Sequence, residues 1–248
     1  VLNILCGAII LGCLVGCVAL QRPREGLNAS DTGIEEVSHV RRILRTACGK
    51  LKDVNAGAMN RDALMDDAKH LTARAGEEWR RYLQSWGDNP PQAYAAHPDW
   101  ASATSDITTG IMQMLNHIEQ REPNPAFKSC GVTCGKFVRL NQQAGVRRTS
   151  DVLFDFRKTA KPLAESVNAG NVSIIQENMQ DLKRLRDKAM IDPVGGRGTP
   201  RAKNRALQAF SDAVNAFDAA VNSGDAEQLP VLYRAMMSSM EAAYDLYL

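Results

Sequence analysis

Residues 37–57 read VSHVRRILRTACGKLKDVNAG. Apolar side chains recur in this stretch every three or four residues, which is the period of an α-helix that packs one face on a core. The closing VNAG contains the Asn and Gly that commonly end helices. The stretch therefore predicts a helix that ends near residues 55–57 and packs through Val37, Val40, Ile43, Leu44, Ala47 and Leu51.

Seven further helices follow by the same criteria. Turn residues separate them, including a Pro-rich break at 87–98 and the pairs Asn124-Pro125 and Thr199-Pro200, which are typical of helix starts. Only 6% of the residues are aromatic, and Ala, Leu and Met are common, which favours helix. The predicted helices cover residues 58–85, 100–122, 125–144, 151–169, 173–191, 200–223 and 226–248.

The two halves of the chain match in letters and in order. VNAG at 54–57 recurs at 167–170, and DAKHL at 67–71 is matched by DLKRL at 181–185. Ser-Asp at 105–106 recurs at 211–212, and at the same separation Phe127, Cys130, Cys134 and Leu140 align with Tyr233, Met236, Met240 and Leu246. Self-similarity in order along a chain indicates a duplicated unit.

The predicted fold class is therefore all-α, with an N-terminal transmembrane helix followed by two tandem four-helix bundles. The first bundle should cover residues 34–148 and the second residues 149–248. A polar linker at 21–33 should join them to the apolar segment at 1–20.

The first copy contains an insertion rich in aromatic residues. The separation between matching positions falls from 114 to 106, so about eight extra residues lie between residues 71 and 105. Two interpretations are open: the rings plug one end of the first bundle, or they form a docking surface for a partner subunit or the membrane interface. The residues concerned are Trp79, Tyr82, Trp86, Tyr94 and Trp100.

Residues 1–20, VLNILCGAIILGCLVGCVAL, carry no charge and are long enough to span a bilayer as a helix. One interpretation is a retained transmembrane anchor, in which Gly12 and Gly16 form a GxxxG that lets another helix approach closely. A second is a lipoprotein signal, because LVGC at 14–17 resembles a lipobox and Cys17 would then be lipidated. A third is an ordinary cleaved signal peptide, and a fourth is a buried core helix.

Two signals in the sequence disagree on which side of the membrane the helical body lies. Arg22 and Arg24 directly follow the apolar segment, and the positive-inside rule places such residues in the cytoplasm. The lipobox instead indicates the outer face. We expect an inner-membrane protein, single-pass or lipid-anchored, with a periplasmic body, because basic residues upstream of Val1 would outweigh the two arginines.

Three cysteines lie outside the apolar segment. Cys130 and Cys134 are four residues apart on one helix face, and Cys48 near the end of the first helix should lie level with them. A disulfide from Cys48 to Cys130 or to Cys134 suits this geometry, as do three buried thiols. A tetrahedral metal site is disfavoured because no fourth ligand has suitable spacing, so we expect no metal.

The stretch SCGVTCGKFVR at 129–139 resembles the fourth helix of the cytochrome c-prime family of four-helix bundles. In that family a CxxCH motif binds haem, and an aromatic residue and an Arg follow the motif in the sequence. Arg139 stands where that Arg would be. The chain has CxxxC, Gly135 in place of the axial His, and Val138 in place of the aromatic residue. The resemblance implies a cytochrome-like bundle without haem or other cofactor; if haem were bound, Cys130 and Cys134 would hold it.

Function is indicated mainly by what the composition and motifs exclude. The net charge of +2 and the mixed-sign basic runs disfavour nucleic-acid binding, and the chain has no P-loop, GxGxxG or HExxH. We expect a non-catalytic accessory or scaffold subunit that binds membrane lipid and other subunits of a larger complex, by analogy one of photosynthetic or respiratory electron transfer. The alternatives are a haem-binding electron carrier with CxxxC attachment and a ligand-sensing lipoprotein.

Overall fold

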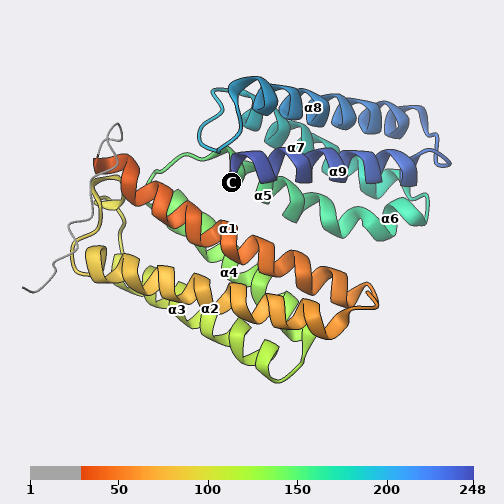
Figure 1. Ribbon diagram of the computed structural model, residues 1–248. Helices are drawn as coiled ribbons and strands as arrows, with labels where there is room; N and C mark the ends of the chain where they lie inside the picture. The colour runs from red at the N-terminus through yellow and green to blue at the C-terminus, as the bar shows by residue number, and fades with distance from the viewer. Residues whose placement is uncertain (1–28) are drawn as a thin grey trace, which may run out of the picture.

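The computed structural model describes residues 29–248, and in this range it is all-α, with no strand. The predicted all-α class is confirmed. The first four helices form one bundle and the later ones a second (Figure 1). The elements are α1 (Ala29–Asn55), α2 (Arg61–Trp86), η1 (Gln92–Tyr94), α3 (Trp100–Glu119), α4 (Pro123–Gln143), α5 (Thr149–Ala160), η2 (Lys161–Leu163), α6 (Ala164–Asn168), α7 (Val172–Met190), α8 (Pro200–Ser223) and α9 (Leu229–Tyr247).

Two of the predicted boundaries need correction. The predicted linker 21–33 ends too late, because residues 29–33 already belong to α1. The Pro-rich loop packs on this part of the helix: a Cβ added to Gly33 would lie 2.5 Å from Pro91. The predicted helix 151–169 is divided into α5, η2 and α6, because Pro162 has no N–H to continue the α-helical hydrogen bonds.

The first bundle is closed at one end by its aromatic insertion. Trp79 stacks on Tyr82 with ring centroids 5.0 Å apart, and its ring edge meets Phe137 at 5.4 Å. The Trp79 indole N–H donates to Thr108 Oγ1 at 3.0 Å. Tyr94 on η1 and Trp100 at the start of α3 continue the cluster, 5.4 Å apart.

The docking interpretation is therefore wrong for the four buried rings, and for Trp86 it stays a prediction. Trp79, Tyr82, Tyr94 and Trp100 are all buried, and Trp86 is half-buried, with its indole N–H donating to Glu36. The inserted segment folds back over the open end of the bundle. Burial of large apolar rings is favoured over exposure wherever the chain allows it.

The second bundle keeps the same core positions with different side chains. Met236 and Met240 are fully buried where the first bundle has Cys130 and Cys134. Phe156 and Phe210 meet edge to face at 4.8 Å in its centre. The Thr199 side chain caps α8 by accepting from Ala202 N, in agreement with the predicted start at Pro200.

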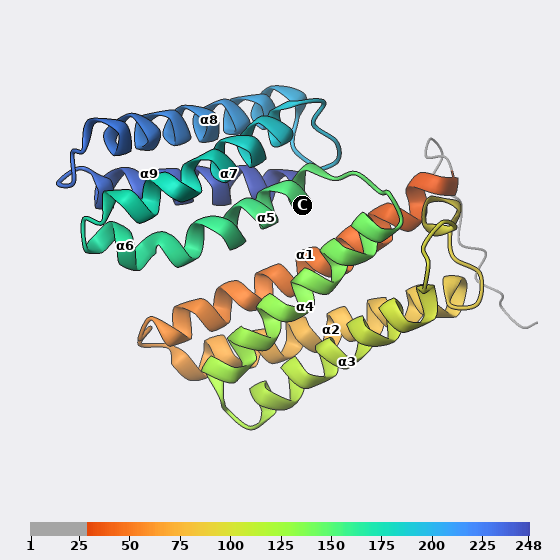
Figure 2. The same cartoon turned by 180° about the vertical axis from the view of Figure 1, so that it is seen from behind.

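The two bundles face each other through α1 and α4 on one side and α5 and α9 on the other, as both views show (Figures 1 and 2). The short connection from Gln143 to Thr149 joins them. None of the helices between residues 29 and 248 is both long enough and apolar enough to span a bilayer. The predicted membrane segment, with Gly12, Gly16 and Cys17, lies outside the described residues.

Candidate functional site

Three cysteines meet in the interior of the first bundle. Cys48 on α1 and Cys130 on α4 form a disulfide with Cα atoms 6.0 Å apart, and Cys134 one turn further along α4 is a free thiol. All three side chains are buried, and their sulfur atoms lie within 4.8 Å of one another. Of the two pairings that the sequence leaves open, the structure contains Cys48 to Cys130.

The environment of Cys134 keeps it in the thiol form. Burial raises the pKa of its thiol, and the positive charges of Arg41, Arg157 and Arg45 offset only part of this effect. A neutral thiol is a poor nucleophile, because the thiolate is the reactive species. Cys134 in this structure is therefore a packing residue beside a disulfide.

The cysteine pair of the cytochrome resemblance does not fit a covalently attached haem in this arrangement. Such attachment needs both Cys130 and Cys134, and Cys130 is already bonded to Cys48. Gly135, which stands in place of the axial His, faces Phe154 from the second bundle, whose ring would lie 3.7 Å from an added Cβ. The space beside the helix is filled by protein side chains, so no chemistry is derived from haem here.

A buried polar network joins the two bundles. Arg41 on α1 forms an ion pair with Asp151 on α5, and both side chains are almost fully buried. Arg41 Nη2 also donates to the Tyr244 hydroxyl at 3.1 Å. Asn141 Nδ2 donates to the other Asp151 oxygen at 2.8 Å, and Asn141 Oδ1 accepts from the Tyr94 hydroxyl at 2.7 Å.

This network sets the relative orientation of the bundles. A buried charge that loses its partner is strongly destabilising, so alternative orientations that separate Arg41 from Asp151 are disfavoured. Burial alone would lower the pKa of Arg41, but Tyr244 and Asp151 outweigh it and raise the pKa above its ordinary value, so Arg41 stays charged. Apolar periodicity alone does not predict this site, although Arg41 stands on the apolar face of its helix, four residues after Val37.

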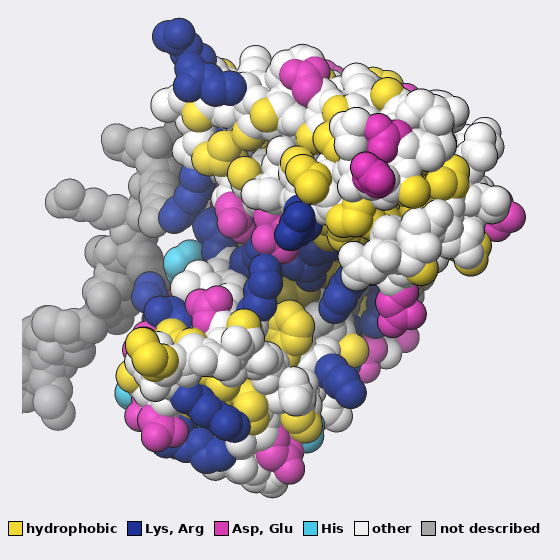
Figure 3. Space-filling view, turned by 90° about the vertical axis from the view of Figure 1, so that its right-hand side faces the viewer, with side chains coloured by type: hydrophobic (Ala, Val, Ile, Leu, Met, Phe, Trp, Pro, Cys, Tyr) yellow, Lys and Arg dark blue, Asp and Glu magenta, His cyan; other side chains and the backbone are white. Residues whose placement is uncertain are grey.

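Further contacts extend toward solvent the contact of α1 and α4 with α5 and α9, which we call the seam. Arg148 Nη1 donates to Glu35 at 2.8 Å, and Arg42 Nη1 donates to the Leu248 carbonyl oxygen at 2.6 Å. Arg45 lies over the Tyr244 ring, and Lys161 lies over the Phe127 ring. In the space-filling view, Lys and Arg side chains gather in the groove between the bundles (Figure 3).

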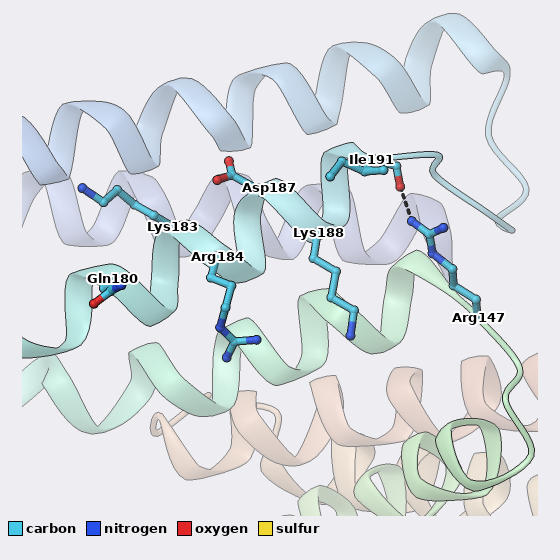
Figure 4. Close-up of a pocket in the computed structure, with 7 residues that line it drawn as sticks. All are labelled: Arg147, Gln180, Lys183, Arg184, Asp187, Lys188 and Ile191. Carbon is cyan, nitrogen blue, oxygen red and sulfur yellow. Dashed lines mark hydrogen bonds between the residues drawn. The ribbon is translucent and has the colours of Figure 1, made fainter.

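A shallow pocket of about 500 Å³ lies on the outer surface of the second bundle. Its lining combines four cations with one carboxylate: Arg147, Lys183, Arg184, Lys188, Asp187, together with Gln180 and Ile191. Arg184 and Lys188 extend from one side of α7 (Figure 4). Arg147, in the connection between α4 and α5, reaches the end of α7 and donates to the Ile191 carbonyl (Figure 4). We call these residues the basic pocket.

Three of the four cations of the basic pocket have a carboxylate partner. Lys183 Nζ donates to Asp218 at 3.0 Å, Arg184 pairs with Asp181 at 3.1 Å on the exposed helix surface, and Arg147 lies 3.9 Å from an Asp192 oxygen. Within the part of the chain that the structure describes, Lys188 has no hydrogen-bond acceptor. Lys188 is therefore the cation of the pocket that remains open to an acidic group from outside.

A second, smaller pocket of about 170 Å³ lies between α3 and α4 and includes Asp106, Lys136 and Arg139. His97 in its wall is fully engaged: one ring nitrogen accepts from Asp99 N at 3.1 Å and the other contacts Gln143 Oε1 at 3.1 Å. Lys136 Nζ donates to the Asp106 carbonyl at 2.7 Å. This pocket is an internally paired polar surface.

Comparison of the chain with models of protein families, with curated proteins and with solved structures found no match.

Proposed function

We propose that the protein is a non-catalytic accessory subunit that acts as a scaffold in a larger membrane complex. The observation that carries this proposal is the basic pocket, whose lining contains four cations and one carboxylate and in which Lys188 has no hydrogen-bond acceptor among residues 29–248. Such a surface suits an acidic segment of a partner protein, since charged complementary patches steer association and set register.

The body behind this pocket suits a scaffold. The Arg41 to Asp151 ion pair and its hydrogen bonds hold the two bundles in one orientation. A partner that touches both bundles would therefore meet a preformed surface and lose little free energy to reorganisation.

The cellular setting follows from the cysteines and the apolar segment. A buried disulfide is typical of an oxidising compartment, which supports a periplasmic body. Residues 1–20 would hold this body at the inner membrane as a transmembrane helix, or Cys17 would hold it through lipid. The resemblance to the cytochrome c-prime bundle supports an electron-transfer complex of respiration or photosynthesis as the host.

The test uses the full chain in its native membrane. After solubilisation in a mild detergent, the wild type should migrate on a native gel as part of a complex larger than its own 27.1 kDa. The double variant Arg184→Glu and Lys188→Glu should release the chain, because two cations of the pocket are reversed. Release should also increase at high salt, which screens surface charge.

A matched control separates the pocket from net charge. Arg201→Glu and Arg205→Glu change the charge by the same amount on exposed positions of α8 outside the pocket. This control should remain in the complex. A wild type that migrates alone, or equal release by both double variants, would contradict the proposal, and a Soret absorption band in the purified protein would favour a haem carrier instead.

A further inference from the structure

The cysteine cluster is the one group of three or more Cys, His, Asp or Glu side chains in residues 29–248 whose ligand atoms meet at metal-binding range. Cys130 and Cys134 lie on successive turns of α4, and Cys48 approaches both from α1. The disulfide occupies two of the sulfurs in the structure. Reduction of that bond would give three thiols in a buried interior, where the three sulfurs lie within 4.8 Å of one another in the oxidised structure.

We propose that the reduced cysteine cluster is a binding site for trivalent arsenic. Thiolates select soft, thiophilic ions, and arsenic(III) takes three sulfur ligands, so it does not need the fourth ligand whose absence disfavours zinc here. The reaction is As(OH)₃ + 3 Cys-SH → As(S-Cys)₃ + 3 H₂O. Three As–O bonds and three S–H bonds break, three As–S bonds and the three new O–H bonds of the released water form, and no electron is transferred.

The product suits this location because it is neutral. Arg41, the buried cation that acts most strongly on the Cys134 thiol, already has Asp151 as its counter-ion. A site built from three thiolates and a divalent cation would add a negative charge to the core, and burial of an unpaired charge is costly. A neutral arsenic adduct adds none, and it also replaces the covalent link between α1 and α4 that reduction removes.

The basic pocket and the proposed scaffold function play no part in this inference. The protein would bind arsenic only in its form with three free thiols, before the disulfide has formed or after it has been reduced. Because the three sulfurs are buried, uptake requires local opening of the first bundle, and we expect slow binding.

The test uses the full chain with Cys6, Cys13 and Cys17 replaced by Ser, so that only the cluster can bind. The protein is reduced with a phosphine, desalted, and titrated with sodium arsenite. Native mass spectrometry should show one added arsenic less three hydrogens. The number of thiols that react with an alkylating reagent should fall from three to none, and the melting temperature should rise.

Two controls make the assignment specific. The same chain with its disulfide intact should take up no arsenic. Cys134→Ser, and separately Cys134→Ala, should weaken arsenite binding by at least about tenfold, since the third ligand is lost from a preformed set, while circular dichroism checks that the fold is kept. Binding by the oxidised chain, no binding by the reduced chain, or unchanged affinity in both Cys134 variants would overturn the proposal.

Discussion

Reduction of the disulfide between Cys48 and Cys130 should destabilise the first bundle strongly. The bond closes a loop of 82 residues that contains the whole of α2 and α3. With n = 82 the loop-entropy relation gives about 15 cal/mol/K, or about 4.5 kcal/mol at room temperature. For a chain of this size each kcal/mol moves the melting temperature by roughly 2–4 °C, so the expected decrease is roughly 9–18 °C.

The assay compares one protein in two redox states. The chain is reduced in denaturant with a phosphine, refolded, and melted beside the oxidised form with circular dichroism as the readout. The double variant Cys48→Ala and Cys130→Ala should melt near the reduced wild type and should not respond to the reductant. A difference below roughly 2 °C between the oxidised and reduced wild type, equivalent to less than about 1 kcal/mol, would refute the reasoning.

Three further perturbations test the seam, the aromatic cluster and the half-buried carboxylate of Asp155. Arg41→Met and Asp151→Leu should each cost about 3–5 kcal/mol of unfolding free energy, and the double variant should recover most of it; additive losses in urea denaturation would contradict the buried pair. Trp79→Ala should cost about 3–5 kcal/mol, whereas Trp79→Phe, which loses mainly the bond to Thr108, should cost less by the same measurement. Burial raises the pKa of Asp155, so the folded state binds the proton of this carboxyl group more tightly than the unfolded state does. The protonated carboxyl therefore stabilises the fold at low pH, and this stabilisation is lost as the pH rises through the raised pKa. Asp155→Asn should therefore gain stability relative to the wild type as the pH rises above the ordinary aspartate pKa of about 4, and a difference in urea midpoints that does not change with pH would exclude this cause.

The contact between the bundles joins two positions that match in the repeated letters of the sequence. At the separation of 113 residues that relates VNAG at 54–57 to VNAG at 167–170, position 41 aligns with Phe154. The guanidinium of Arg41 lies over that Phe154 ring. The two matched positions therefore contribute a cation and an aromatic ring to one contact between the bundles.

The second bundle offers a direct comparison for the cysteine cluster. Met236 and Met240 occupy the positions of Cys130 and Cys134 and are equally buried. Thioethers fill such space but form neither disulfides nor covalent bonds to arsenic. The chemistry of the cluster therefore belongs to the first bundle alone, although the packing role is common to both.

The sequence by itself determined the helices and their order. Apolar periodicity predicts each helix between residues 37 and 248, because a helix must bury one face, and capping residues such as Thr199 indicate where helices begin. The same pattern placed Cys48, Cys130 and Cys134 in one interior. Only local spacing and burial were needed for these predictions.

The tertiary structure decided what periodicity does not encode. The interpretation of the Trp79 cluster depended on where the inserted loop folds, and the partner of Cys48 depended on the exact level at which α1 crosses α4. The ion pair of Arg41 and Asp151 joins residues 110 positions apart. Such contacts arise from the packing of whole bundles. A buried charge is stabilised by a counter-ion beside it, and here that counter-ion comes from a segment far away in the sequence.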